Sequence, residues 1–478
     1  MRHPALTLLA ASLLLATGLA SAADTAIPAA AVKTAEQLRD KALRDPTAMA
    51  VLTSLTTEVG PRLAGSDADQ RARDWVVAKF KALGFDKVYT EPATYPLWVR
   101  RRESAAIVAP FPQHLVLTAL GYSPGTPKGG LTAQVVGFDS LAALKAADPA
   151  TIKGKIVYVG FRMQRHQDGH DYGMGSMVRV AGPVIAAQKG AAGYLLRSAG
   201  TDAHQRIAHT GVTGFKPGDK AIPAAALSNP DADQLERVLV YGKPVTVKLD
   251  LDCGIVGEYT GANVIGEITG RKHPDQVVAI GGHLDSWDPG TGAIDDGAGI
   301  AISMAAARLI HDLPQRPDRT IRVIAFANEE MGLWGARAYA DRHAKEVANF
   351  MLGTDSDLGA GKVYRMSASV KPQARHAIQQ IADVLKPLGV AYDPNRPGGG
   401  GSDLGSMHAR GMAALTLDQD ATHYFDWHHT SNDTLDKVVP AELAQNVAAY
   451  AAWTWMAAQA DGDFGSAPGA FKGDGAEE

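Results

Sequence analysis

The stretch that decides the fold is Ala279–Ile310, AIGGHLDSWDPGTGAIDDGAGIAISMAAARLI, in which an apolar strand-like run leads into a loop and a helix-like run leads out. The loop carries one histidine and four aspartates, namely His283, Asp285, Asp288, Asp295 and Asp296. Charged side chains are costly to bury unless they are paired or coordinate a metal. The segment is therefore either an exposed acidic loop or a loop that holds a cation.

The chain around this stretch alternates between strand-like and helix-like runs. The strand-like runs are 262–270, 276–282, 320–327, 348–354 and 412–418, and helix-like segments follow at 298–313 and after Gly332. Strands that alternate with amphipathic helices favour a parallel sheet. We therefore predict an α/β fold with a mostly parallel central sheet flanked by helices.

Several of these predicted strands end in side chains that bind metals. His283 ends one strand, Glu329 and Glu330 end another, and Asp357 follows a third. Open α/β sheets bind ligands at the carboxyl ends of their strands, so these side chains should meet at one edge. Each motif alone has a plainer reading, as a capping turn, a helix start or a polar loop. Their common placement favours a metal site over an exposed loop.

The predicted metal ligands are His283, Asp295, Glu330, Asp357 and His429. Five such ligands suffice for two zinc ions if one carboxylate bridges them and water completes the set. Glu329 is not needed as a ligand and is free to act as a general base. The single cysteine, Cys253, excludes an internal disulfide and a cysteine zinc site. The net charge of −4, without a basic run, gives no indication of a nucleic-acid partner.

The composition and the pattern of predicted elements divide the chain into five segments. Residues 1–22 resemble a signal peptide cleaved near Ala22, although a membrane anchor is the alternative reading. After its removal we expect a periplasmic or secreted protein with no membrane partner. Residues 23–102 and 253–461 form the predicted catalytic domain, 103–252 an inserted module of short strands, and 462–478 a disordered tail. The glycine run 398–401 is interpreted as a mobile lid over the site.

The motifs GGHLDSWD, GAIDDGAG, ANEEMGLWGA, DSDLG and HHTSNDT resemble the dizinc exopeptidases that include aminopeptidase Y and plasma glutamate carboxypeptidase. The similarity is closest to the carboxypeptidase Q branch and extends over nearly the whole chain after the signal segment. The resemblance implies the zinc exopeptidase fold, a protease-associated-like domain at 103–252, and a homodimer.

The resemblance also implies a role for each site residue. His283 and Asp357 would bind one zinc ion, Glu330 and His429 the other, and Asp295 would bridge them. Asp285 would hydrogen-bond the His283 imidazole, and Glu329 would be the general base and then the acid. In this family the peptide bond after the bridging aspartate, here Asp295–Asp296, is cis.

The sequence therefore predicts an exported dizinc metallopeptidase that hydrolyses short unblocked peptides, dipeptides above all. The main rival is a zinc aminopeptidase of the same fold. A mono-zinc glutaminyl cyclase and a binding ectodomain without metals are the two further alternatives. A zinc count of two, one or none per chain separates the peptidases, the cyclase and the binding domain.

Overall fold

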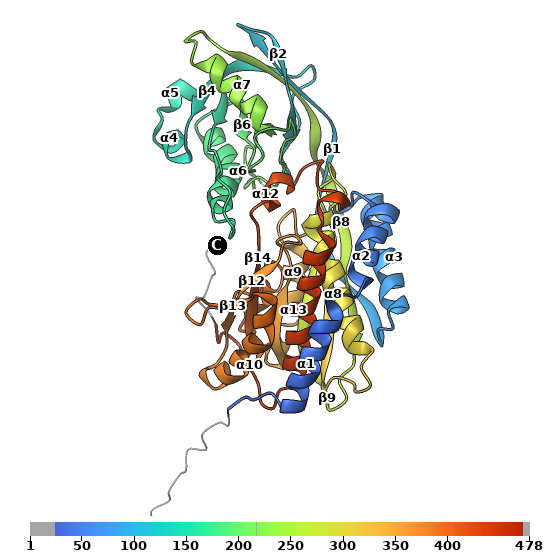
Figure 1. Cartoon of the computed structure of the whole chain (residues 1–478). Helices are drawn as coiled ribbons and strands as arrows, with labels where there is room; N and C mark the ends of the chain where they lie inside the picture. Colours follow the sequence, from blue (N-terminus) through green and yellow to red (C-terminus); the bar gives the residue numbers. More distant parts are fainter. Residues whose placement is uncertain (1–23, 217, 472–478) are drawn as a thin grey trace, which may run out of the picture.

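The computed structural model describes residues 24–216 and 218–471, so the predicted signal segment lies outside the described residues. Two lobes are joined by two long strands, β1 (Lys87–Ala109) and β8 (Thr246–Ile268), which pair antiparallel over their whole lengths (Figure 1). We call residues 110–245, which lie between these strands in the sequence, the small lobe. The remaining described residues form the large lobe.

The sheet of the large lobe has the order β13–β12–β14–β11–β9–β10–β8. Its further strands are β9 (His273–His283), β10 (Arg319–Phe326), β11 (Phe350–Asp355), β12 (Val363–Ser369), β13 (Ala391–Tyr392) and β14 (Ala414–Gln419). The central strands β10, β9, β11 and β14 run parallel, whereas β8 and β12 pair antiparallel with their neighbours. The predicted α/β fold with a mostly parallel central sheet is confirmed.

Helices cover both faces of this sheet because its central strands are apolar on both sides. One face packs against α1 (Ala29–Ala42), α2 (Thr47–Ser54), α3 (Asp67–Ala82), α8 (Ala298–His311), α10 (Arg375–Leu385) and α13 (Pro440–Gln459). The other face packs against α9 (Trp334–Arg342) and α11 (Gly405–His408). Along β9, Val278 and Ile280 join the first core and Val277 and Ala279 the second, as the alternation of a strand requires.

The strands of the small lobe continue the sheet of the large lobe beyond β8, and this lobe has an apolar core of its own. Its strands are β2 (Gln113–Leu115), β3 (Leu117–Ala119), β4 (Leu131–Phe138), β5 (Ile156–Val159), β6 (Gly193–Arg197) and β7 (Ala224–Leu227), and its helices are α4 (Leu141–Ala146), α5 (Pro149–Ile152), α6 (Asp171–Gln188) and α7 (Asn229–Leu239). Strands β4 to β7 run parallel. The predicted boundaries at 103 and 252 fall inside β1 and β8, which stay paired across them. The protease-associated-like character of this lobe remains a prediction.

The C-terminal segment differs from the expected disordered tail. Residues 462–471 pack against the large lobe, with Phe464 fully buried and its carbonyl accepting a hydrogen bond from the Lys371 N–H. The segment is mostly polar and rich in glycine, which suggested disorder, but the single buried Phe464 anchors it to the core. Among the helices of residues 24–216 and 218–471, none has the length and apolar character that crossing a bilayer needs.

Candidate metal centre and active site

Three neighbouring strands deliver polar side chains to one edge of the sheet. His283 is the last residue of β9, Glu330 lies just beyond β10, and Asp357 lies two residues beyond β11. The backbone N–H of His283 donates to the Asp296 carboxylate over 3.0 Å. A side chain on Gly282 would overlap that carboxylate, so the strand end needs glycine at this position. The edge thus holds His283 with its ring turned toward the loop of Asp295.

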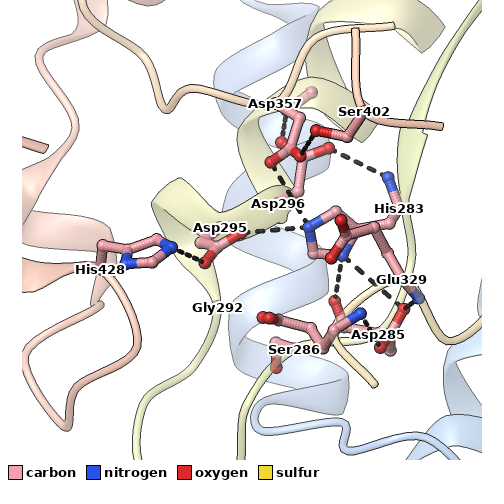
Figure 2. A network of polar contacts seen from close by, with 12 residues as sticks. His283, Asp285, Ser286, Gly292, Asp295, Asp296, Glu329, Asp357, Ser402 and His428 are labelled. Carbon is pink, nitrogen blue, oxygen red and sulfur yellow. Dashed lines mark hydrogen bonds and ion pairs between the residues drawn. The ribbon is translucent and has the colours of Figure 1, made fainter. Parts of the chain in front are cut away.

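Asp295 occupies the centre of the cluster. It lies in the short turn η2 (Ala293–Gly297), and its peptide bond to Asp296 is cis, as the resemblance implies. One carboxylate oxygen lies 3.0 Å from Nε2 of His283, and the other lies 3.2 Å from Nε2 of His429. Figure 2 shows this carboxylate between the His283 ring and the histidine segment. The arrangement is that expected of a carboxylate that bridges two cations.

Two pairs of side chains flank Asp295. On one side, Nε2 of His429 lies 2.9 Å from the Glu330 carboxylate. On the other, Nε2 of His283 lies 3.5 Å from the Asp357 carboxylate, which also accepts a 2.5 Å hydrogen bond from the Ser402 hydroxyl (Figure 2). The structure therefore brings together all five side chains predicted as metal ligands, in the two groups that the resemblance implies.

Asp285 contacts the His283 imidazole, as the resemblance implies, but through its backbone carbonyl. The imidazole Nδ1 of His283 lies 2.9 Å from the backbone carbonyl of Asp285 and 3.7 Å from its carboxylate. The carboxylate instead accepts hydrogen bonds from the backbone N–H groups of Glu329, at 3.0 Å, and Glu330, at 3.4 Å. These two hydrogen bonds satisfy backbone N–H groups just after β10. The chain turns there at Asn328, which has a φ of +51°. Asp285 thereby orients both glutamates as well as His283.

Two residues that the sequence analysis did not select hold the Asp295 loop. The buried Asp433 carboxylate accepts hydrogen bonds from the N–H groups of Ala293 and Ile294, at 2.7 Å each, and of Asp295, at 3.2 Å. The fully buried Arg62 guanidinium donates to backbone carbonyls at both ends of the 284–292 loop. The only indication of this role in the sequence was that Asp433 lies four residues after the predicted ligand His429.

The histidine segment is held partly by the small lobe. His429 has a φ of +61°, and its Nδ1 lies 3.1 Å from the carbonyl of Thr210, which fixes the ring nitrogen that faces Asp295. His428 stacks on His429 with ring centroids 3.5 Å apart, and its Nε2 lies 3.4 Å from the Asp295 carboxylate. His428 is not among the predicted ligands, although its place beside one of them was a signal in the sequence.

The glycine run is anchored and does not form the predicted lid. The Asp355 carboxylate accepts hydrogen bonds from the N–H groups of Ser402, at 3.0 Å, and Leu404, at 2.7 Å. The Gly400 carbonyl accepts a hydrogen bond from the backbone N–H of Asp355, and the Gly400 N–H donates one to the carbonyl of Leu415. The loop thus extends the sheet edge and places the Ser402 hydroxyl on Asp357.

The electrostatics of the cluster call for a cation. Burial raises the pKa of Glu330 to about 7 and raises the pKa of Glu329 well above its ordinary value. Burial lowers the pKa of His283, but the charge of Asp357 and hydrogen bonds to nearby carboxylates outweigh it, so this pKa is raised. One oxygen of Asp295 and one of Glu330 are buried without a hydrogen-bond donor. Carboxylates and imidazoles with free coordinating atoms fit transition metals such as zinc.

The cluster opens into a cavity of about 350 Å³ between the lobes. Glu329, Glu330, Asp357 and His429 line it from the large lobe, and Tyr172, Arg179 and Val212 line it from the small lobe. Tyr172 of α6 stacks on Phe425 of α12 (Tyr424–Trp427), and α6 lies beside α12 where the two lobes meet (Figure 1). The small lobe therefore forms one wall of the cavity.

Comparison with known proteins places this site in a family. The family model for peptidase family M28 matches residues 263–454. Carboxypeptidase Q of Bos taurus is 33% identical over 407 residues, which cover 85% of this chain and 84% of that protein. The chain belongs to peptidase family M28.

Two further relatives cover nearly the whole chain. The crystal structure of a peptidase M28 precursor from Shewanella amazonensis superposes with a TM-score of 0.89 at 48% identity, and covers 92% of this chain and 99% of that one. Aminopeptidase YwaD of Bacillus subtilis is 25% identical and covers 92% of this chain and 91% of its own length. The predicted resemblance and the predicted enzyme class, a metallopeptidase, are confirmed.

Proposed function

We propose that this M28 peptidase is an exported dizinc exopeptidase that hydrolyses short unblocked peptides, and dipeptides above all. The observation that carries the proposal is the convergence of five ligand-type side chains around Asp295, at the base of a cavity that the small lobe walls.

The residues divide into two sets that suit two metal ions. His283, Asp357 and one oxygen of Asp295 would hold one zinc ion, and Glu330, His429 and the other oxygen would hold the second. When bound, a zinc pair polarises a carbonyl and lowers the pKa of water. Asp285, Asp433 and the Thr210 carbonyl orient these ligands through the contacts described above.

Glu329 is suited to move the proton. Its side chain lines the cavity beside Glu330 but makes none of the contacts to Asp295 that the proposed ligands make. Burial raises its pKa, so it can take a proton from the attacking water and pass it to the leaving amine. Its backbone N–H is fixed on the Asp285 carboxylate, which holds the side chain at the cavity.

The size of the cavity supports small substrates. A volume of about 350 Å³ lies near the lower end of the roughly 300–1,000 Å³ typical of small-molecule pockets. The wall made by the start of α6 bounds this cavity on the side of the small lobe. An aminopeptidase is the second candidate. The same metal site could remove the first residue from a peptide that has a free amino end, whatever the length of the chain after that residue.

The zinc-reconstituted protein tests these points together. We expect close to two zinc ions per chain by elemental analysis, loss of dipeptide hydrolysis with a chelator, and its return with zinc. Free dipeptides should be cut faster than their acetylated or amidated forms. Equal cleavage of amidated aminoacyl substrates would establish the aminopeptidase reading, and active protein without bound metal would refute the proposal.

Export and assembly are separate parts of the proposal. Residues 1–22 would direct the chain out of the cytoplasm and be removed near Ala22. The amino-terminal sequence of protein recovered from the periplasm or medium tests this. The homodimer implied by the resemblance is tested by the mass of the purified protein in solution.

A further inference from the structure

A second group of metal-binding side chains lies in the small lobe, in the loop before α6 and at the first residue of that helix. The group consists of His166, His170 and Asp171, whose coordinating atoms all lie within 4.8 Å of one another. The side chains of His166 and His170 are 35% and 58% exposed, and that of Asp171 is 25% exposed. An ion from solvent can therefore reach all three without entering the active-site cavity.

One carboxylate oxygen of Asp171 faces both imidazoles. It lies 3.7 Å from Nε2 of His166 and 3.7 Å from Nε2 of His170. These distances are too long for hydrogen bonds, and they are close to the separation of about 3.3 Å between neighbouring ligands of a tetrahedral zinc ion. The other oxygen of Asp171 accepts a 2.8 Å hydrogen bond from the backbone N–H of Gln164, which fixes the carboxylate in this orientation. The two rings stack with their centroids 3.7 Å apart.

Asp168 prepares the His170 ring for coordination. Its carboxylate lies 2.7 Å from Nδ1 of His170, and this hydrogen bond lowers the pKa of Asp168. An ionised carboxylate only accepts, so Nδ1 of His170 carries a proton and Nε2 of the neutral ring keeps its lone pair. Histidines that bind metals usually donate their other N–H group to a carboxylate in this way. Within residues 24–216 and 218–471, Nε2 of neither His166 nor His170 takes part in a hydrogen bond.

His343 shows what an ordinary pairing of histidine with carboxylates looks like in this protein. Its Nδ1 lies 3.0 Å from the Glu346 carboxylate, and its Nε2 lies 3.1 Å from that of Glu91. Both ring nitrogens are therefore satisfied at hydrogen-bond distance. The group at His166 and His170 differs, because its nitrogen and oxygen atoms converge on one point and remain apart.

The loop that carries the two histidines is docked on the large lobe. Arg165 pairs with Asp426 of α12 at 2.8 Å, and the Gln167 carbonyl accepts a 2.8 Å hydrogen bond from the N–H of Ala421. Directly after Asp171 comes Tyr172, which lines the active-site cavity. An ion held by this loop and the first residue of α6 would therefore sit at the junction of the lobes.

We propose that His166, His170 and Asp171 bind a divalent transition-metal ion, of which zinc is the model, at this junction. Two imidazoles, one carboxylate and a water molecule make up a four-coordinate set that suits zinc. Calcium and magnesium prefer oxygen ligands and are disfavoured by two imidazoles. The site is additional to the zinc pair proposed around Asp295. Because it is exposed and has three protein ligands, it should fill at higher free zinc than the buried pair.

Counting ions tests the site. The metal-free full chain is dialysed to equilibrium against zinc in excess of two ions per chain, and bound zinc is measured by elemental analysis. His166→Ala and His170→Ala should each hold one zinc ion fewer than the unmodified protein. Asp168→Asn should keep the site but need about 10- to 100-fold more free zinc to fill it. Dialysis against calcium should give no such difference between unmodified protein and variants.

His114→Ala is the matched control, because His114 is an exposed histidine of the same lobe, on β2 and outside the group. Its zinc count should equal that of the unmodified protein. Equal counts in His170→Ala and the unmodified protein overturn the inference. Loss of an ion in His114→Ala also overturns it, because zinc is then held by surface histidines in general.

A second measurement needs no variant. Zinc should protect His166 and His170 of the unmodified protein from diethylpyrocarbonate, as peptide mass spectrometry would show, while His114 stays reactive. Modification of His166 and His170 that zinc does not change overturns the inference. Both measurements are independent of the active site. The difference of one ion stands whether that site holds two, one or no zinc ions, whereas the count left in His170→Ala bears on the proposed function alone.

Discussion

Replacing Asp433 with alanine should destabilise the fold and weaken the metal site together. This carboxylate is buried and accepts three backbone hydrogen bonds from the loop that carries Asp295. Two of these bonds are short, at 2.7 Å, and the third, from the N–H of Asp295, is 3.2 Å long. Alanine removes all three acceptors and leaves the N–H groups buried.

The size of the effect follows from these contacts. A hydrogen bond to a charged group contributes about 1.5–3 kcal/mol, and an unpaired buried donor costs a similar amount. Water that enters the space and relief from burying a charge both offset part of the sum, so we expect a loss of about 3–5 kcal/mol in the free energy of unfolding. Loss of support behind a bridging ligand should also weaken zinc binding by about 10- to 100-fold.

Urea unfolding of the metal-free protein measures the first effect, and competition with a zinc indicator dye measures the second. Asp433→Asn should be milder, because the amide oxygen can still accept the two short bonds while its NH₂ faces the N–H of Asp295. Asp436→Ala is the matched control, since that carboxylate is exposed and bonds only to Thr434 and Lys437. A change below about 0.5 kcal/mol in Asp433→Ala, with unaltered zinc affinity, would refute the reasoning.

Other perturbations act on the glutamates and on the charge of the site. Glu329→Gln should keep its zinc but lose about 10²–10⁴-fold in turnover, and near-normal turnover would remove it as the base. Glu330→Gln should instead lose zinc, as elemental analysis would show. In chelator, stability should fall as the pH rises from 4 to 7, because burial raises the pKa of Glu330, Asp355 and Asp433 to about 7 and the folded state binds the extra protons. A midpoint of urea unfolding that rises between pH 4 and pH 7 would contradict this prediction. Ser402→Ala should weaken zinc binding by less than about tenfold in the dye assay, because it removes one hydrogen bond from a ligand; a larger loss would give Ser402 a greater role.

The placement of the metal site could be predicted because it depends on local patterns. The apolar runs that end at His283, Glu330 and Asp357 identify three strands, and the geometry of parallel sheets brings their ends together. Neither step needs a contact between distant residues to be known in advance. The same reasoning fixes the fold class, since the period of the apolar residues distinguishes strand from helix.

The supports of the site could not be predicted, because they join residues far apart in the chain. Asp433 bonds to a loop about 140 residues before it, and Arg62 bonds to a loop more than 200 residues after it. A lone buried arginine and an aspartate in a polar loop carry no local signal of these partners. The lid prediction failed for a related reason: glycine-rich composition indicates backbone freedom, but the Asp355 carboxylate anchors this loop through two hydrogen bonds.

The two lobes contribute different parts of the site, and they meet at the Thr210 carbonyl. All five proposed zinc ligands and Glu329 come from the large lobe, whereas Arg179 and Thr210 come from the small lobe. The Thr210 oxygen accepts from a ring nitrogen of His429 and from the Arg179 guanidinium, so it links the orientation of a proposed metal ligand to the cavity wall formed by the small lobe. His209 reinforces this contact, with its Nδ1 2.6 Å from the carbonyl of His428. A shift of the small lobe would therefore alter the orientation of a proposed metal ligand and the shape of the cavity together.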